Sequence, residues 1–317
     1  MTKRERVLAA VEGRSPDRVP YSLWYHFRRD PPAGPGLAAA TLDFYRRFAP
    51  DLLKVMHDAP YDMPADLPAV YEPADWRRLD VLDGSSGQFG QQIDTLRIIL
   101  NGRDEDVPVI PTVFGVYATA EKISGRRVAE HLQRDREEVE AGLDAITQSI
   151  CSYVSRLTEI GVDGIYLAIQ GAASDTLTEA VHRDFFLGRE QAVLDAARSL
   201  PLNVVHHHGC GIYTRDVLPL EGYAIYSWSD HAPGNPDIRE MRLRTQKCLM
   251  CGVNEIGFGE AKPDELLRQA QAALEAGGRT SFILAPGCAV PTPPACTDEQ
   301  LGIFVQAVGA SVIEERQ

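Results

Sequence analysis

GIYLAI at residues 164–169 is a short, continuous apolar run that directly follows a segment of helical periodicity, residues 136–161. Runs of this kind recur at residues 19–24, 52–56, 107–115, 164–169, 203–208, 223–228, 248–254 and 281–286. Continuous apolar strands that alternate with helices predict a parallel sheet with both faces covered. Eight such units predict an α/β fold of the (β/α)₈ TIM-barrel type, with an additional helix at the N-terminus. A doubly wound open sheet is the alternative, although no GxGxxG motif follows an early strand.

The composition is that of one globular domain, which we assign to residues 1–317. Hydrophobic residues make up 44% of the chain and charged residues 24%, and barrels of this length form single domains. The 45 acidic residues exceed the 32 basic ones, which gives a formal net charge of −13. This balance argues against nucleic acid or an anionic membrane as a partner, because both bind to clustered cations.

The N-terminal sequence, MTKRERVLAAVEG, has the pattern of a short amphipathic helix and lacks the long apolar stretch of a signal peptide. No apolar run in the chain approaches the length of about 18 residues that a membrane-spanning helix needs. We therefore expect a cytoplasmic protein. Its six cysteines are then expected to be reduced, as metal ligands or buried thiols.

Polar residues gather where the predicted strands end. In a barrel of this kind the active site lies at the carboxyl ends of the strands. The residues expected there are Tyr25, His26, His57, Asp58, Phe114, Tyr117, Gln170, His208, Cys210, Asp230, His231, Asn254, Glu255 and Cys288. Many of them are residue types that bind metals or transfer protons, so we expect a functional site at this rim.

The most specific pattern is VVHHHGCG at residues 204–211. His208 and Cys210 are two residues apart, so both point to the same side of an extended chain. Cys288 follows the last predicted strand and is expected on the same rim. One imidazole and two thiolates form a zinc donor set that leaves a fourth position open, as in catalytic sites. His206 shares the face of His208 and is an alternative ligand, whereas His207 points to the opposite face.

Three segments give the chain a resemblance to the uroporphyrinogen decarboxylase superfamily. The opening MTKRERVLAAVEGRSPDRVP (1–20) is similar to that family's first helix and its entry into the first strand. FAPDLLKVMHD (48–58) resembles the second strand region, and ILAPGCAVP (283–291) resembles the last strand and its loop. The resemblance implies a (β/α)₈ barrel, in agreement with the strand pattern.

Two branches of this superfamily imply different chemistry. True uroporphyrinogen decarboxylases grip substrate carboxylates through an RQAGRY motif, and this chain has WYHFRR at residues 24–29 instead. The cobalamin-dependent methyltransferases carry a His-x-Cys pair and a distant Cys as zinc ligands, which correspond to His208, Cys210 and Cys288. The resemblance therefore implies methyl transfer between a corrinoid and a thiol or methoxylated substrate. The corrinoid is expected on a separate partner protein, because the carrier motif DxHxxG is absent from the sequence.

Further roles at the rim follow from residue chemistry. Glu255 is the preferred candidate for a fourth zinc ligand, and Asp230 is a second candidate; either carboxylate could instead cap a helix. His26 and His57 are candidates for positioning substrate or for acid–base catalysis, since histidine titrates near neutrality. Asp230 and Gln170 complete the set of candidate catalytic residues.

Two other functions remain open from the sequence. One is a metal-free decarboxylase that uses Arg28 or Arg29 to bind a carboxylated substrate. The other is a barrel that binds a ligand and has lost catalysis. The CxxC pair Cys248 and Cys251 lies within a predicted strand, where positions i and i+3 face opposite sides, so we expect core packing rather than a metal site.

Overall fold

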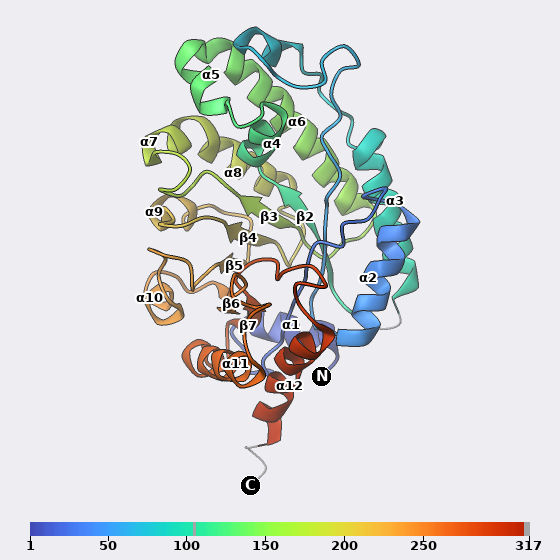
Figure 1. Ribbon diagram of the computed structural model, residues 1–317, viewed down its shortest axis with the longest axis vertical. Coiled ribbons are helices and arrows are strands. Elements are labelled where there is room, and N and C mark those ends of the chain that lie inside the picture. The colour runs from blue at the N-terminus through green and yellow to red at the C-terminus, as the bar shows by residue number, and fades with distance from the viewer. Residues whose placement is uncertain (104–105, 314–317) are drawn as a thin grey trace.

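The computed structural model describes residues 1–103 and 106–313, in which a single parallel sheet forms the centre of the protein (Figure 1). Its strands are β1 (Leu53–Val55), β2 (Val109–Phe114), β3 (Tyr166–Ile169), β4 (Val204–His207), β5 (Ile225–Trp228), β6 (Cys248–Val253) and β7 (Phe282–Pro286). Each strand pairs in parallel with the next one along the chain. The predicted α/β class and parallel sheet are therefore confirmed.

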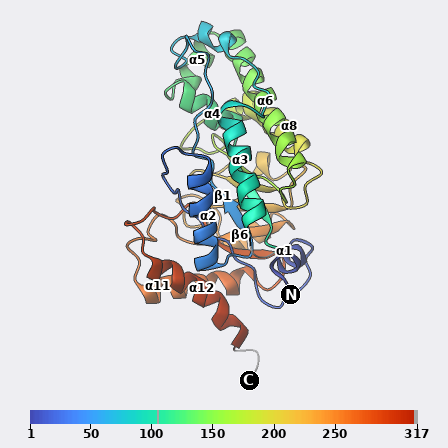
Figure 2. The same ribbon diagram turned by 90° about the vertical axis from the view of Figure 1, so that its right-hand side faces the viewer.

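Helices surround this curled sheet, and its parallel pairing requires them as crossovers between strands. They are α1 (Lys3–Val11), α2 (Pro35–Phe48), η1 (Pro73–Arg78), α3 (Gly87–Gly102), α4 (Val116–Ile123), α5 (Val128–Arg134), α6 (Arg136–Glu159), α7 (Glu179–His182), η2 (Arg183–Leu187), α8 (Gly188–Ala196), α9 (Thr214–Val217), α10 (Ile238–Arg242), α11 (Pro263–Gly277) and α12 (Asp298–Ile313). Figure 2 shows α2 and α3 side by side in front of β1. None of the helices in the described part of the chain has the length and apolar character needed to cross a membrane.

The prediction of eight strands is wrong for the described residues, because the first apolar run, residues 19–24, does not form a strand. It makes a single bridge, between Tyr21 and Leu284 of β7. The Leu284 amide donates to the Pro20 carbonyl at 2.9 Å, and the Asp51 amide donates to the Tyr21 carbonyl at 2.9 Å. The run thus contacts both edges of the sheet. Proline lacks an amide proton, which limits the ladder that this run can form.

The sheet is buried on both faces, as its continuous apolar strands predict. Inside the curl lies a small core that includes Trp24, Met56, Ile110, Tyr166, Val204, Ile225, Met250 and Ile283. A larger core fills the space between the sheet and the helices. Cys248 belongs to the inner core and Cys251 to the outer one, so the two thiols of the CxxC pair face opposite sides of β6 and pack as expected.

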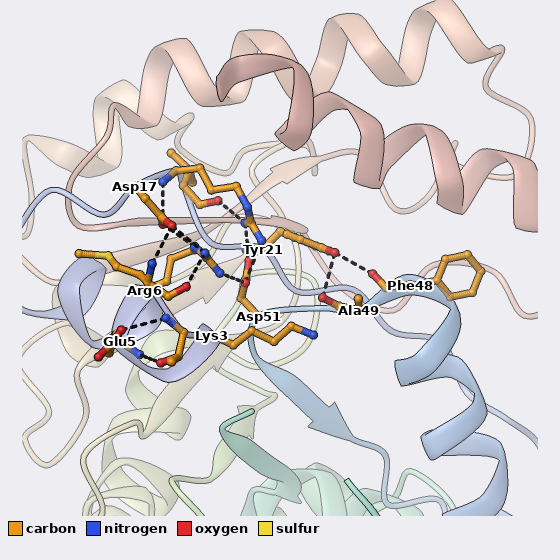
Figure 3. A network of polar contacts seen from close by, with 12 residues as sticks. Lys3, Glu5, Arg6, Asp17, Tyr21, Phe48, Ala49 and Asp51 are labelled. Atoms are coloured by element: carbon orange, nitrogen blue, oxygen red, sulfur yellow. Dashed lines mark hydrogen bonds and ion pairs between the residues drawn. The ribbon is translucent and has the colours of Figure 1, made fainter. Parts of the chain in front are cut away.

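A network of ion pairs joins α1 to the amino end of the sheet (Figure 3). Arg6 donates to Asp17 at 2.7 Å and to Asp51 at 2.7 Å, and Arg18 donates to the other oxygen of Asp51 at 2.6 Å. The Tyr21 amide also donates to Asp51, which is fully buried just before β1. Asp51 therefore connects the N-terminal helix, the bridging segment and the first strand.

A candidate metal centre at the carboxyl ends of the strands

The three consecutive histidines at the end of β4 have alternating directions. His206 lies inside the curl of the sheet, where its ring stacks on Tyr166 with centroids 5.1 Å apart. His207 points outward, and its ring nitrogens lie 2.7 Å from the Tyr226 hydroxyl and 2.7 Å from the Ala172 carbonyl. His208, the residue after the strand, returns to the inner side, 5.6 Å from His206 between ring centroids. The alternation follows from the pleat of the strand.

Cys288 comes from the loop after β7 and meets these histidines although it is 80 residues from His208 in sequence. Its Sγ lies 3.8 Å from His208 Nδ1. One donor atom each from His206, His208 and Cys288 lie within 4.8 Å of one another. The carboxyl ends of parallel strands share one edge of the sheet, which is why β4 and β7 can bring these donors together.

Cys210 lines the same pocket but is not a member of this three-atom cluster. Its amide donates to Asp175 Oδ2 at 2.9 Å. The flanking residues Gly209 and Gly211 have φ values of 127° and 66°, in the left-handed region that glycine adopts without strain. The chain therefore turns at the two residues that flank Cys210. Burial together with the Asp175 carboxylate raises the pKa of the Cys210 thiol.

The pocket has a volume of about 430 Å³ and includes His208, Cys210, Glu255 and Cys288 among its lining residues. Glu255, the preferred candidate for a fourth ligand, is buried there. Ser229 lines the same pocket, a position that the sequence analysis did not single out. This side chain follows β5, and only the geometry of the loop turns it inward.

Several buried polar atoms around the pocket lack a hydrogen-bond partner within the described residues. They are His206 Nε2, Glu255 Oε2 and Ser229 Oγ. An unsatisfied buried polar group costs about 1–3 kcal/mol, so such groups require an explanation. Burial lowers the pKa of both His206 and His208, which keeps their rings neutral and able to donate a lone pair. Two imidazoles, a thiol and a carboxylate are the donor types that Zn²⁺ binds, so the residues present fit a zinc ion.

The environment of His206 also fits a metal ligand. His206 Nδ1 lies 3.3 Å from Ser227 Oγ, and that hydroxyl lies 3.3 Å from the Tyr166 hydroxyl. Contact of one ring nitrogen with a fixed polar group orients the other nitrogen, a common arrangement around ligating histidines. The free nitrogen here is Nε2, the atom without a partner.

The structure places the other candidate catalytic residues apart from this pocket. Asp230 accepts a hydrogen bond from the Gly252 amide at 3.0 Å and borders a groove between α10 and α11. His26 Nδ1 pairs with Asp58 at 2.6 Å on the rim. His57 lines a separate apolar cavity, where burial lowers its pKa to about 4. Gln170 lines a pocket of about 490 Å³ that also includes His208, a member of the donor cluster.

The residues of the decarboxylase alternative are exposed. Arg28 and Arg29 both lie at the surface, in the loop that follows the bridging segment. Neither side chain contributes to the pockets described above.

Lys54 on β1 is a buried residue that the sequence analysis did not identify. Its Nζ lies inside the curl, 4.4 Å from the centroid of the Tyr166 ring and 3.0 Å from Met56 Sδ. Burial lowers the pKa of Lys54 to about 7, although the nearby Cys288 and Asp58 favour its charged form. The burial of this lysine could not be predicted from the short apolar run that contains it, because only the curling of the sheet encloses the side chain.

The sequence of this chain matches a known protein family. Residues 56–310 match the family described as uroporphyrinogen decarboxylase (URO-D), which is most of the chain. The chain belongs to this family. The resemblance expected from the sequence is thereby confirmed.

Two curated relatives that are similar to this chain are methylcobamide:CoM methyltransferases MtbA. The protein from Methanosarcina acetivorans is 20% identical over 218 residues, which cover 68% of this chain and 62% of the relative. The protein from Methanosarcina mazei is 20% identical over 207 residues, which cover 65% of this chain and 59% of the relative. The match thus spans about three fifths of the length of these relatives.

Solved structures support the fold. A methyltransferase from Methanosarcina mazei superposes with a TM-score of 0.79 at 18% identity, covering 98% of this chain and 99% of the other. A B12-independent methionine synthase from Shewanella sp. W3-18-1 superposes with a TM-score of 0.51 at 13% identity, covering 71% and 66%. The agreement over nearly the whole chain shows that this protein and the methyltransferase from Methanosarcina mazei share one fold.

Gly287 has no side chain and so leaves room for the carboxylate of Glu255, which leads to a first prediction. A Cβ atom at Gly287 would lie 2.6 Å from Glu255 Oε2 and 2.6 Å from Ser229 Cα. We expect Gly287→Ala to destabilise the fold by about 1–3 kcal/mol, because the loop or the carboxylate must move. The measurement is chemical denaturation. Gly302→Ala is the control, since it has no neighbour within 4 Å of an added Cβ; equal midpoints for the two variants would contradict the prediction.

Proposed function

We propose that this protein is a zinc-dependent methyltransferase that moves a methyl group between a corrinoid on a partner protein and a thiol or methoxylated substrate. The observation that carries the proposal is the cluster of His206, His208 and Cys288 donors in an open pocket at the strand ends. The methylcobamide:CoM methyltransferases among its relatives support methyl transfer as the reaction and a corrinoid as the methyl carrier.

His208 and Cys288 would hold the zinc ion, and the third protein ligand would be Cys210 or His206. Glu255 is the candidate for a fourth ligand. A zinc ion in such a site supplies Lewis acidity, which favours the thiolate form of a bound thiol or polarises an ether oxygen. The two alternatives for the third ligand differ in charge, since Cys210 adds a second thiolate and His206 adds a neutral imidazole.

The surrounding residues have defined supporting roles in this proposal. Asp175 fixes the backbone of the HxC turn through the Cys210 amide. Ser227 orients the His206 ring through Nδ1. Tyr166 belongs to the apolar inner core and stacks on the His206 ring, which holds that ring from the inner side.

Metal content tests the proposal directly. The protein is purified without chelator and under reducing conditions, and zinc is measured by elemental mass spectrometry. We expect about one zinc per chain, as for a site with these donors. His208→Ala and Cys288→Ala should abolish zinc binding. Cys151→Ala is the matched control, because this thiol lies on α6 and its Sγ contacts the Ala192 carbonyl.

Two further variants identify the third ligand. Loss of zinc in Cys210→Ala with retention in His206→Gln would assign Cys210, and the reverse result would assign His206. Demethylation of methylcobalamin by coenzyme M, the acceptor named for the relatives, then follows as the activity assay. A protein free of zinc, with variants indistinguishable from wild type, would overturn the proposed function.

A further inference from the structure

A second cavity, separate from the donor cluster, lies between the sheet and the helices α3, α4 and α6. Its volume is about 230 Å³. An apolar cavity of about 150 Å³ holds a benzene molecule, so this one has room for a single ring with a small substituent. Nothing in the proposed methyl transfer uses this space.

The walls of the cavity are largely aromatic. Phe89 of α3 and Tyr153 of α6 stack with centroids 4.5 Å apart and an interplanar angle of 12°. Tyr61, from the loop after β1, packs edge-on against Phe89 at 6.2 Å, and Phe114 ends β2 at the opposite side of the lining. Aromatic side chains favour aromatic ligands through offset and edge-to-face contacts, each of about 0.5–1.5 kcal/mol beyond the burial of area.

The cavity also contains a cation without an anionic partner. Lys122 of α4 lines it, and its Nζ lies 3.7 Å from the centroid of the Phe114 ring. No hydrogen bond or ion pair to this ammonium is present among the described residues. The nearest carboxylate that influences it, Asp58, is paired with His26 at 2.6 Å. Two other charged residues lie near Lys122 in the sequence, Glu121 on the same helix and Arg126 just after its end. Both line the neighbouring pocket rather than this cavity.

Two further polar groups complete the lining. The hydroxyl of Tyr153 is buried and has no hydrogen-bond partner in the described part of the chain. His57 lies on the wall, and burial holds its pKa at about 4, so it is neutral at physiological pH and adds no second positive charge. The cavity therefore offers an aromatic wall, one ammonium and one hydroxyl that has no partner in the described chain, a combination that matches a monovalent anion on a ring.

We propose that this cavity is a binding site for a single-ring aromatic carboxylic acid, whose ring lies against Phe89 and Tyr153 and whose carboxylate pairs with Lys122. One ammonium matches one negative charge, which favours a carboxylate over a divalent phosphate. Lys122 also lines the pocket that contains Gln170 and His208. The charged group of the bound acid thus lies at the wall between this cavity and the pocket that contains Gln170 and His208.

Binding of benzoate to the full chain tests this proposal by isothermal titration calorimetry. We expect a dissociation constant of about 1 mM or tighter, and at least about tenfold weaker binding of neutral benzamide, because the charge on Lys122 then has no counter-ion. Acetate should not bind detectably, since it lacks the ring. Equal binding of acetate and benzoate, or of benzamide and benzoate, would overturn the proposal.

Variants separate the two parts of the site. Lys122→Met should remove the preference for benzoate over benzamide, and Lys262→Met, which changes an exposed lysine, should leave it intact. Ala69→Phe, on the loop that lines the cavity, should block both ligands by filling the space. Equal affinity of benzoate for wild type and both cavity variants would contradict the site, and circular dichroism verifies that each variant is folded.

The outcome is independent of the zinc proposal. Titrations are made with the zinc-loaded protein and with the protein after chelation. Benzoate binding by a protein that contains no zinc when it is purified without chelator would sustain this cavity and overturn the methyltransferase mechanism. Zinc-dependent demethylation of methylcobalamin by a chain that does not bind benzoate would do the opposite.

Discussion

Asp51→Ala is expected to lower the free energy of unfolding by about 3–5 kcal/mol, the effect of removing one partner from a buried ion pair. Asp51 is fully buried and accepts hydrogen bonds from Arg6, Arg18 and the Tyr21 amide (Figure 3). Without the carboxylate, the Arg18 guanidinium loses its ion-pair partner and Arg6 keeps only Asp17. Asp51 also accepts a hydrogen bond from the Tyr21 amide in the bridging segment, residues 19–24. The substitution therefore removes this contact in addition to the ion pairs.

Urea denaturation followed by circular dichroism measures this effect. The control is Asp43→Ala, which removes a carboxylate that is 67% exposed and pairs with Arg47 at 3.5 Å on α2. An exposed pair of this kind contributes about 0–1 kcal/mol. If the two variants unfold at the same urea concentration, the network at the amino end of the sheet does not stabilise the fold as we infer.

The second large effect has the opposite sign, because Lys54→Met is expected to stabilise the protein by about 2–4 kcal/mol near neutral pH. The ammonium of Lys54 is buried over the Trp24 and Tyr166 rings and has no carboxylate within hydrogen-bonding distance in the described chain. Methionine has a similar length and no charge, so it fills the same space without the desolvation cost. The difference between the folded and unfolded pKa of this lysine sets an upper bound of about 5 kcal/mol. The loss of the contacts between the ammonium and the two rings reduces this gain.

The pH dependence gives this prediction its sharpest test. The pKa of Lys54 falls from 10.5 in the unfolded chain to about 7 in the fold. Below about pH 7 Lys54 is protonated in both the folded and the unfolded protein, so the full cost of burying its charge is present. Between about pH 7 and pH 10.5 only the unfolded protein keeps this proton, so the stability of the wild type rises with pH. The advantage of Lys54→Met should therefore be largest at about pH 6 and shrink towards about pH 10.

Chemical denaturation of wild type, Lys54→Met and the surface control Lys262→Met across this pH range measures the effect. The control is expected to stay within about 0.5 kcal/mol of wild type at every pH. A stabilisation by Lys54→Met that does not change with pH would mean that packing, rather than the buried charge, accounts for it. A destabilised variant would mean that the contacts of the ammonium with the two rings outweigh its desolvation.

Much of the fold was predictable from the sequence because apolar runs mark strands that are buried on both faces. The run at residues 248–254 becomes β6, Cys248–Val253, and the run at 203–208 becomes β4, Val204–His207. The run at residues 19–24 is also mainly apolar but forms a single bridge. Composition and periodicity cannot separate these cases, because strand formation depends on how the backbone meets its neighbours in the fold.

The candidate site was predictable to the extent that strand ends determine it. His208 and Cys288 lie together because both follow strands of one parallel sheet. Asp230 also follows a strand, yet it turns towards the groove between α10 and α11, since the direction of a loop residue depends on local turns that periodicity does not describe. From the sequence, Cys210 was the expected ligand and His206 an alternative. The structure groups His206 with His208 and Cys288 and keeps Cys210 in the same pocket.

The two rims of the sheet differ in what they do. The ion-pair network that includes Asp51 lies before β1, at the amino ends of the strands, whereas the donor cluster and the aromatic cavity lie at or beyond the carboxyl ends. A substitution in a rim loop can therefore change what the protein binds without touching the contacts that hold α1 to the sheet. This separation allows new specificities to arise by gradual change. Each substitution in a rim loop leaves the stabilising ion pairs at the amino ends of the strands in place.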